Sequence, residues 1–550
     1  MVAKKQVNVD VLVVGGGFGG VYAVWRLRAE GFKIHLFEGT HRLGGVWSNN
    51  TYPGARVDSE FPFYQLSIPE VYKTWIWKER FPDWQELQAY FDHVDKFLDV
   101  SKDATYNALV DNATFNTEIG RWTVHTEQGH VATCKQLLLC TGSTYKQSVP
   151  NWEGLDQYTG KLIHSSKWPK GGMSAHGKRV AIIGSGSTAI QIVQELSKEA
   201  KELVTLIRTP NIALPMKQRK LSWEEQDSFK GFLNGMLKTA ARSSYGGYPY
   251  NPTPAPSPRQ LSVEDREKFF EEQYQRGGFN FGVGNFIAML FDRTDNRIIY
   301  DYWVKKTRAR MQDPVKRDIL APLEPPNHFM AKRCSLEQDY YEMCDKDHVR
   351  VVDLKVTPID SFTTEGLRVG GEDIPVDIIV LATGFDNYTG AFSTMGLEGT
   401  DGKGLMERWK DGVQTHLGLT APHHPNMWMV YGPQAPTALG NGPTIVEVQV
   451  DVIVDMIKKA RDENIKYLDA TPEAAQAWAD DIAATSKTTL LEDANSWYMG
   501  ANIPGKKREM LNYLKGLVQY EKSCRDAIPN WDGFVVEKET RVQRSQQSVL

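Results

Sequence analysis

The residues of this chain whose types and spacing could do chemistry begin with a glycine-rich turn. Gly15, Gly17 and Gly20 follow the apolar run VDVLVV (9–14) and open a helical pattern. This arrangement lets the backbone approach a pyrophosphate and aims a helix N-terminus at its charge. Glu38 ends the next apolar run, where a carboxylate can accept both ribose hydroxyls of an adenosine. A lone G-x-G-x-x-G motif is weak evidence, but this order of strand, turn, helix and strand predicts a dinucleotide site.

A second unit repeats this pattern and ends on the opposite charge. Gly184 ends the apolar run RVAIIG (179–184), and Gly186 and Ala189 then open a helical pattern. The next run, ELVTLIR, ends at Arg208, whose guanidinium suits a 2′-phosphate and favours NADP. One acid-ended and one arginine-ended site indicate two different dinucleotides, and FAD with NADP is the economical interpretation. Two vestigial folds are the alternative.

Two further apolar runs indicate how these sites share one chain. LLLCTG (137–142) and DIIVLATG (377–384) both end in Thr-Gly and are typical of buried parallel strands. The sequence predicts an α/β fold class, with two Rossmann-like dinucleotide-binding domains for FAD and NADP and a helical insertion. The expected boundaries are 1–145 and 380–550 for the FAD-binding domain, 146–212 and 328–379 for the NADP-binding domain, and 213–327 for the insertion.

The insertion contains one segment with neither helical nor strand periodicity. YGGYPYNPTPAPSP (245–258) holds five prolines. A loop of this kind could close over a site as a lid, and an inert surface loop is an equally open alternative.

Composition excludes several classes of function. The chain has 550 residues, 41% of them apolar and 24% charged, which is typical of a globular protein with more than one domain. A net charge of −4 and the lack of a basic stripe argue against nucleic-acid binding. The five cysteines form no C-x-x-C pair and the histidines show no metal spacing, so we expect a reducing compartment and no metal site.

The N-terminal stretch superficially resembles an export signal. Residues 11–25 are uncharged and follow two lysines, but five glycines interrupt them. The stretch is also shorter than the ~20 apolar residues of a membrane span. The last three residues, SVL, lack the basic middle residue of a peroxisomal address. We therefore expect a cytoplasmic protein with no membrane segment.

Three polar features outside the dinucleotide motifs need an explanation. Arg56 and Asp58 form a polar pair after a Pro-Gly turn, where a loop that joins two strands is the simpler interpretation. His164 is a lone histidine without a matching nucleophile, which favours a structural role. Lys332 and Arg333 interrupt an interior-looking stretch, and buried charges are costly unless they face a partner. We expect this dibasic pair to face an anion.

Together these residues match a known family. The chain resembles, over nearly its whole length, the flavoprotein Baeyer-Villiger monooxygenases of the two-dinucleotide, single-chain type. Their marker F-x-G-x-x-x-H-x-x-x-W, followed by Pro or Asp, reads here as Tyr158, Gly160, His164, Trp168 and Pro169, with Tyr in place of Phe. Further matches in family order are G-x-W through Y-P-G-x-x-x-D (45–58), R-T-P (208–210), K-R before Y-Y (332, 333, 340, 341), A-T-G-F (382–385) and W-Y-x-G-A-N-x-P-G-K (497–506).

The resemblance implies an enzyme that converts ketones to esters or lactones with NADPH and dioxygen. Arg333 is then the catalytic arginine, which stabilises a flavin C(4a)-peroxide and the oxyanion that forms when it attacks the ketone. Asp58 is the carboxylate partner that holds Arg333. His164 is structural or couples domain motion to turnover, and it is not an acid–base catalyst.

The resemblance also implies the residues that contact the two cofactors. Lys332, Arg208 and Thr209 would hold the 2′-phosphate of NADP, and Trp497 would pack on its nicotinamide. The other positions expected to contact FAD or NADP are Gly15, Gly17, Gly19, Gly20, Glu38, Val46, Trp47, Asp58, Tyr64, Val110, Gly442, Arg56, Gly184, Ser185, Gly186, Ser187, Thr188, Ala189, Gln191 and Arg333.

Two other activities use the same folds. A flavin monooxygenase that oxidises nitrogen or sulfur does not need Arg333, and a flavin-dependent reductase is the less favoured alternative. Substrate choice stays open, because this chain has Ser143 after Thr-Gly where related enzymes often have Gln. The expected partners are a small-molecule ketone and dioxygen, with no nucleic acid and no membrane, and the expected state is a monomer or weak oligomer.

Overall fold

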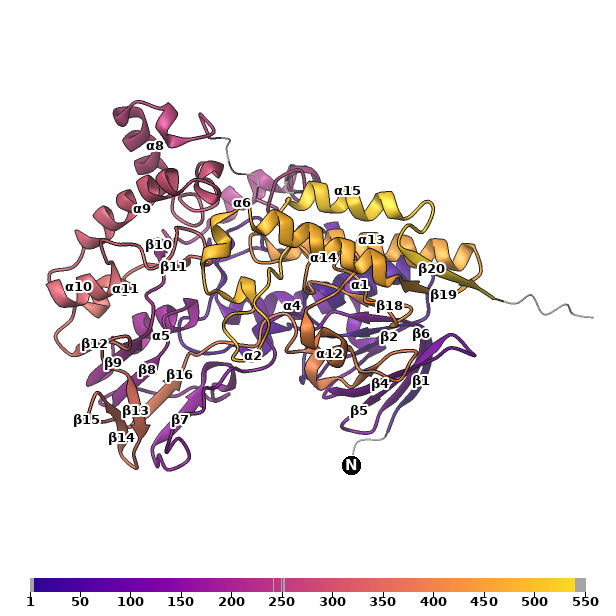
Figure 1. Ribbon diagram of the computed structural model, residues 1–550, viewed down its shortest axis with the longest axis horizontal. Helices are drawn as coiled ribbons and strands as arrows, with labels where there is room; N and C mark the ends of the chain where they lie inside the picture. Colours follow the sequence, from indigo (N-terminus) through magenta and orange to yellow (C-terminus); the bar gives the residue numbers. More distant parts are fainter. Residues whose placement is uncertain (1–3, 241, 249, 251–252, 540–550) are drawn as a thin grey trace, which may run out of the picture.

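Two β-sheets, the first mixed and the second parallel, form the framework of the chain, and helices flank each of them. The computed structural model describes residues 4–240, 242–248, 250 and 253–539. Figure 1 shows the second sheet and the helical insertion on the left, and the first sheet on the right beneath the C-terminal helices. Among the described residues, no helix has both the length and the apolar character needed to cross a membrane.

The first sheet contains the first glycine-rich motif. Its strand order is β17-β4-β5-β6-β1-β2-β3, and β18 also pairs with β6. The residues of β1 from Val11 to Val14 are at most 7% exposed, as expected for a parallel strand covered on both faces. The strands are β1 (Gln6–Val14), β2 (Ile34–Phe37), β3 (Ala104–Thr105), β4 (Val110–Asn116), β5 (Arg121–Thr126), β6 (Val131–Leu139), β17 (Leu397–Glu398) and β18 (Met427–Met429).

The second sheet contains the second glycine-rich motif, and all its strands run parallel. Their order is β12-β9-β8-β16-β7. Strand β16 lies beside β8 in this sheet. The expected domain boundary at residue 380 therefore falls inside this strand. The strands are β7 (Lys161–His164), β8 (Arg179–Ile183), β9 (Glu202–Ile207), β12 (Val349–Asp353) and β16 (Ile378–Leu381).

The chain returns to the first sheet after β16. Strand β18 adds to β6, and the long helix α13 (Gly442–Asp462) then packs against α1 (Phe18–Ala29). Most of α13 is buried, because its apolar residues recur at helical spacing on the face turned to the core. The other helices of the two units are α2 (Val46–Asn49), α3 (Pro69–Tyr72), α4 (Trp84–Leu98), α5 (Ser187–Leu196), α11 (Tyr340–Cys344), α12 (Leu405–Arg408), α14 (Pro472–Ser486) and α15 (Leu517–Ala527).

Small sheets complete the two units. A three-stranded antiparallel sheet precedes β16. A second small sheet pairs β19 with β20, the last strand of the described chain. These strands are β13 (Ile359–Phe362), β14 (Gly366–Val369), β15 (Glu372–Pro375), β19 (Ile465–Ala470) and β20 (Phe534–Lys538).

The insertion is helical, as the sequence predicts, but its first helical pattern is broken. The run that begins at Trp223 is interrupted around Gly231 and Gly235, since glycine lowers helix stability. Ser222, Ser262 and Asp292 cap three of the helices through their side-chain oxygens. The elements are β10 (Ala213–Pro215), which pairs with β11 (Ser335–Glu337), and the helices α6 (Trp223–Lys230), α7 (Leu233–Gly235), α8 (Val263–Arg276), α9 (Arg293–Arg308) and α10 (Pro314–Leu320).

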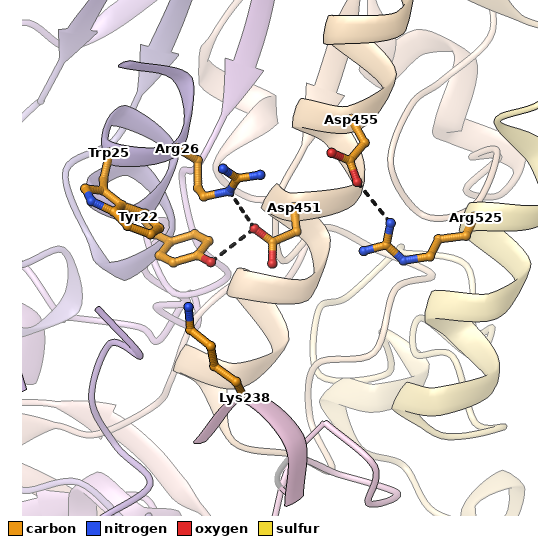
Figure 2. A pocket seen from close by; sticks show the side chains of 7 residues that line it. All are labelled: Tyr22, Trp25, Arg26, Lys238, Asp451, Asp455 and Arg525. Carbon is orange, nitrogen blue, oxygen red and sulfur yellow. Dashed lines mark hydrogen bonds and ion pairs between the residues drawn. The ribbon is translucent and has the colours of Figure 1, made fainter. Parts of the chain in front are cut away.

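One carboxylate joins the insertion to the first unit. Asp451 of α13 accepts hydrogen bonds from Tyr22 Oη at 3.0 Å and Arg26 Nε at 2.9 Å, both on α1 (Figure 2). Arg242, which follows the insertion's first helices, donates to the second Asp451 oxygen at 2.9 Å. A surface pocket of about 250 Å³ lies at this joint, lined by Tyr22, Trp25, Arg26, Lys238, Asp451, Asp455 and Arg525. None of these residues belongs to the dinucleotide motifs.

Candidate active site

The first glycine-rich turn is packed too tightly for any side chain. A Cβ at Gly15, whose φ is +103°, would lie 2.4 Å from the Cys140 carbonyl oxygen. A Cβ at Gly20 would lie 1.8 Å from the Gly15 carbonyl oxygen. Gly17 is the N-cap of α1, and no side chain caps this helix. The free N–H groups at the start of α1 can therefore bind the pyrophosphate that the motif predicts.

Glu38 lies where the adenosine ribose of a dinucleotide would be bound. It follows β2 directly and is only 5% exposed. Its Oε2 accepts from the Gly16 N–H at 2.5 Å and its Oε1 from the Thr40 N–H at 2.7 Å. Each carboxylate oxygen keeps a further lone pair for a ribose hydroxyl. Val110 begins β4 and is 2% exposed.

The flavin ring would be bound beyond this turn, where three predicted residues meet. Trp47 on α2 donates from Nε1 to Tyr64 Oη at 2.9 Å. Gly442 starts α13, and a Cβ there would lie 4.0 Å from the Tyr64 ring. Val46, beside Trp47, leaves 38% of its surface exposed. Gly19 lies in the first turn of α1, where an added Cβ would lie 3.2 Å from the Val430 side chain.

The second glycine-rich turn has the same construction and more open space. A Cβ at Gly184, whose φ is +134°, would lie 2.3 Å from the Ala382 carbonyl oxygen. Gly186 is the N-cap of α5, and a Cβ there would meet no atom within 4 Å. The hydroxyl of Ser185 donates to the Thr209 carbonyl at 2.6 Å, which connects the turn to the end of β9. This space above the start of α5 fits a second pyrophosphate.

The neighbouring predicted residues fix α5 against the first unit. Ser187 shares a hydrogen bond of 2.9 Å with Ser335, and Gln191 accepts from Tyr52 Oη at 2.9 Å. Thr188 lies 3.4 Å from the same Tyr52 oxygen, and Ala189 is 2% exposed. Ala189 stands at the last position of the glycine-rich motif, where a small residue allows the helix to pack closely on the strand.

A cluster of positive charge lies beside the second turn. Arg208 follows β9 and is exposed, and both Arg208 and Lys355 are close enough to Lys332 to repel its charge. Burial, followed by the charges of Arg208 and Lys355, lowers the pKa of Lys332 to about 8. Three cations gathered without a carboxylate among them fit the 2′-phosphate of NADP. Lys355 was not predicted from the sequence, because only strand pairing brings the end of β12 next to the end of β9.

Arg333 and Asp58 form a bidentate ion pair, as the sequence comparison implied. Arg333 Nε donates to Asp58 Oδ2 at 2.8 Å and its NH2 group donates to Oδ1 at 2.9 Å. The remaining terminal nitrogen donates to the Ala438 carbonyl at 2.6 Å. Burial opposes the charge of Arg333, but Asp58 outweighs it and holds the arginine pKa well above its usual range. The guanidinium therefore stays charged at any working pH.

Aromatic rings enclose the Arg333 guanidinium. It lies 4.7 Å above the centroid of the Phe279 ring, from the insertion. The hydroxyls of Tyr248, Tyr431 and Tyr498 are close enough for the Arg333 charge to lower their pKa values, although burial raises each one overall. Tyr498 lies in a family motif and Tyr248 in the proline-rich segment that the sequence singled out, while Tyr431 lies in no segment that the sequence indicated.

Arg56 does not pair with its sequence neighbour Asp58. Its NH1 group donates to Glu79 Oε2 at 2.9 Å and to the Phe81 carbonyl at 3.0 Å. Its own carbonyl accepts from Gln191 Nε2 on α5 at 3.1 Å. Arg56 thus contacts the second unit through its backbone, while its charge is neutralised by a carboxylate.

His164 and Trp168 of the marker motif are both buried. His164 Nε2 lies 3.2 Å from the Gly384 carbonyl and Nδ1 lies 3.0 Å from the Ser166 hydroxyl. Burial lowers the pKa of His164, so the ring is neutral near pH 7. These contacts connect β7 to the turn after β16. The Tyr158 hydroxyl, the departure from the motif, donates to the Val376 carbonyl at 3.0 Å.

Trp497 lies in a short turn near the C-terminal end of the chain. Its ring is partly buried and lies 5.6 Å from the Tyr388 ring and 4.7 Å from the Tyr498 ring. Within the described residues, no group of three or more His, Cys, Asp or Glu side chains could hold a metal ion.

Comparison with known proteins agrees with this geometry. A family model described as pyridine nucleotide-disulphide oxidoreductase matches residues 9–232. The FAD-binding monooxygenase acrE of Aspergillus aculeatus is 40% identical over 97% of this chain and 90% of its own length. Cyclopentanone 1,2-monooxygenase of Comamonas sp. is 38% identical over 96% of both chains. A structure of an oxidised steroid monooxygenase bound to NADP superimposes with a TM-score of 0.91 at 32% identity, over 97% of this chain and 100% of that one. The chain therefore belongs to the family of flavoprotein Baeyer-Villiger monooxygenases.

Proposed function

We propose that this protein binds FAD and NADPH and uses dioxygen to convert ketones to esters or lactones. The position of Arg333 is the observation that carries this proposal. Its guanidinium bonds to Asp58 and Ala438 on the side of the first dinucleotide motif, while its neighbour Lys332 lies in the cation cluster of the second. A permanent charge held between two dinucleotide sites suits a reaction that involves both cofactors.

The two turns fit the two cofactors in different ways. Gly15, Gly20 and the acidic Glu38 fit the adenosine diphosphate of FAD, while Arg208, Lys332 and Lys355 fit the 2′-phosphate that distinguishes NADP from NAD. Structures of related proteins contain FAD and NADP, or NADP. FAD, once reduced by NADPH, would supply the reaction with dioxygen.

Arg333 would stabilise negative charge on oxygen during the reaction. Insertion of oxygen beside a carbonyl passes through an oxyanion, and a fixed cation in a water-poor site stabilises such an anion without reorganising. A neutral donor would suffice for oxidation of an amine or sulfide. Asp58 keeps the guanidinium in place, and the bidentate contact defines its orientation.

Trp497 and the aromatic rings around Arg333 would exclude water. Trp497 is only partly buried and lies beside Tyr388 and Tyr498, so its ring offers a flat surface to a nicotinamide. A dry site strengthens the electrostatic interactions of Arg333 and keeps water away from the reacting groups. His164, bonded to the turn after β16, would serve structure or domain motion rather than proton transfer.

The proposal includes the protein's partners and surroundings. A small ketone and dioxygen are the expected substrates, and names of relatives include cyclopentanone and acetone monooxygenases. All five cysteines are free and four of them are buried, which favours a reducing compartment such as the cytoplasm. The expected state is a monomer or weak oligomer.

Labelled oxygen gives the direct test of this function. Purified protein with FAD, NADPH and ¹⁸O₂ would be incubated with cyclopentanone, cyclohexanone and acetone, and the products analysed by mass spectrometry. The expected product is an ester or lactone that contains one ¹⁸O atom. Sulfide or amine oxidation without any ester would identify the heteroatom-oxidising alternative, and flavin reduction without any oxygenated product would identify a reductase.

A further inference from the structure

The proline-rich segment of the insertion delivers a tyrosine to Arg333. Tyr248 is 4% exposed, and its ring stacks on Tyr250 with centroids 5.3 Å apart and an interplanar angle of 17°. Its hydroxyl lies 2.5 Å from the hydroxyl of Ser59, the residue that follows Asp58. Tyr248 also lies close enough to Arg333 for the guanidinium charge to lower the pKa of its phenol, and both side chains lie against the Phe279 ring. Residues 246–248 of this segment are therefore buried and are not an inert surface loop.

The number of N–H donors on Arg333 indicates what a nearby phenol can do. A guanidinium has five N–H donors. Two of them point to Asp58 and one to the Ala438 carbonyl, which leaves two. If the Tyr248 hydroxyl accepts a hydrogen bond from one of these two donors, it can donate its own hydrogen bond to the Ser59 hydroxyl. One Arg333 N–H donor then remains for a reacting oxygen. Burial raises the pKa of Tyr248 to about 12, so the phenol is neutral and keeps that proton.

The backbone before Tyr248 is fixed to the first unit. The Gly246 carbonyl accepts from the Asn441 N–H at 2.7 Å, and Asn441 is the N-cap of α13. A Cβ at Gly246 would lie 2.3 Å from the Leu439 carbonyl oxygen, so only glycine fits there. Arg242 bonds to Asp451, and Tyr245 donates to the Leu514 carbonyl. The two Gly246 contacts, closest in the chain to Tyr248, determine where Tyr248 enters the site.

We propose that Tyr248 is a positioning residue for Arg333, and this inference rests on the proposed function. Its phenol links the guanidinium to Ser59 and, with Asp58 and Ala438, restricts the guanidinium to one orientation. Phe279 closes the face of the guanidinium, and the Tyr248 ring lies 6.4 Å from the Phe279 ring. Without the hydroxyl, Arg333 would keep its charge and its carboxylate but gain rotational freedom.

Removal of this hydroxyl tests the proposal. Tyr248→Phe should keep the ring, the bound FAD and the rate at which NADPH reduces the flavin. Ester formation from cyclopentanone should fall about 10- to 100-fold, because small errors in position cost rate steeply. The ester formed per NADPH consumed should fall, with hydrogen peroxide accounting for the difference. Weaker stabilisation of an anion should also move the acid limb of this ratio by about one unit to higher pH.

A matched control separates positioning from loop stability. Tyr245→Phe removes another hydroxyl from the same segment, one bonded to the Leu514 backbone, and should change neither the ester yield per NADPH nor its pH limb. Ser59→Ala removes the other end of the Tyr248 link, and its effect should be less than additive with Tyr248→Phe. If Tyr248→Phe behaves like Tyr245→Phe while the natural protein makes ester, Tyr248 does not position Arg333. Absence of ester from the natural protein would instead contradict the proposed function.

Discussion

At the scale of single residues, charge decides which chemistry the site can support. Arg333 is stabilised as a cation although it is buried, because Asp58 outweighs the cost of burial. Lys332, one residue earlier, shows the opposite behaviour, since burial and two like charges lower its pKa to about 8. These adjacent basic residues therefore have different roles. Arg333 is permanently charged, whereas the charge of Lys332 depends on pH and suits the binding of an anion.

The low pKa of Lys332 makes NADPH binding sensitive to pH. Below pH 8 the ammonium is charged and can bind the 2′-phosphate, and above pH 8 it loses its proton and that attraction. The KM for NADPH should therefore rise by up to about tenfold between pH 7 and pH 9. Steady-state kinetics would measure this rise.

A variant and a second coenzyme provide the controls for this prediction. Lys332→Met should raise the KM for NADPH and abolish its dependence on pH in this range. NADH lacks the 2′-phosphate, so its KM should be the same in both proteins. An equal pH dependence for NADH would show that Lys332 does not bind that phosphate.

At the scale of elements, two turns of similar sequence differ in the space above them. Gly15 packs against the Cys140 backbone and Gly20 against the Gly15 backbone, so only glycine fits at these two positions of the first turn. Gly186 has no neighbour within 4 Å of its Cβ position, and φ is −76°, which any residue can adopt. Within the motif, Gly20 therefore serves packing, whereas Gly186, at the position of the middle glycine, leaves access for a ligand.

Alanine at these two glycines should separate folding from coenzyme binding. Gly20→Ala places a Cβ 1.8 Å from a backbone oxygen, so little FAD-loaded protein should be recovered. Gly186→Ala should fold and carry a normal amount of FAD, but its KM for NADPH should rise because the methyl group narrows the approach to α5. Flavin absorbance per protein and steady-state kinetics check both results. Normal FAD content in Gly20→Ala would contradict the packing argument.

Local patterns explain which elements could be predicted from the sequence. The glycine turns, β1, β8 and the charges at Glu38 and Arg208 depend on near neighbours in the chain, and the structure places them as expected. The sheet that takes up β16 could not be read from its apolar run, because strand pairing is a contact between distant segments.

At the scale of the whole molecule, the site around Arg333 is assembled from four separate segments. Asp58, Tyr248, Arg333 and Ala438 lie far apart in the sequence, and only the fold brings them together. Family resemblance indicated Arg333 and Asp58. It gave no indication of Tyr248 or of the Ala438 carbonyl, because neither has a local motif and a carbonyl can belong to any residue.

The joint between the insertion and the first unit should contribute to stability. Arg242 bonds to Asp451 and lies 3.4 Å from Glu447, which is 1% exposed. Arg242→Met would leave a buried carboxylate without its cation, at a cost of about 3 kcal/mol in the free energy of unfolding. Chemical denaturation would measure the change.

An exposed ion pair between α13 and α15 is the control for that joint. Arg525 bonds to Asp455 at 3.0 Å, and both side chains are about 40% exposed (Figure 2). Arg525→Met should cost less than about 1 kcal/mol, since water screens exposed pairs. Equal losses in the two variants would show that Arg242 is an ordinary surface residue.

The fate of NADPH in Arg333→Ala tests the central claim most directly. The variant and the natural protein would be supplied with NADPH, dioxygen and cyclopentanone, and the ester and hydrogen peroxide formed per NADPH would be measured. The expected result is continued NADPH oxidation in the variant, with peroxide in place of ester. Ester formation at the natural yield per NADPH would contradict the role of Arg333 and, with it, the mechanism derived from its contacts.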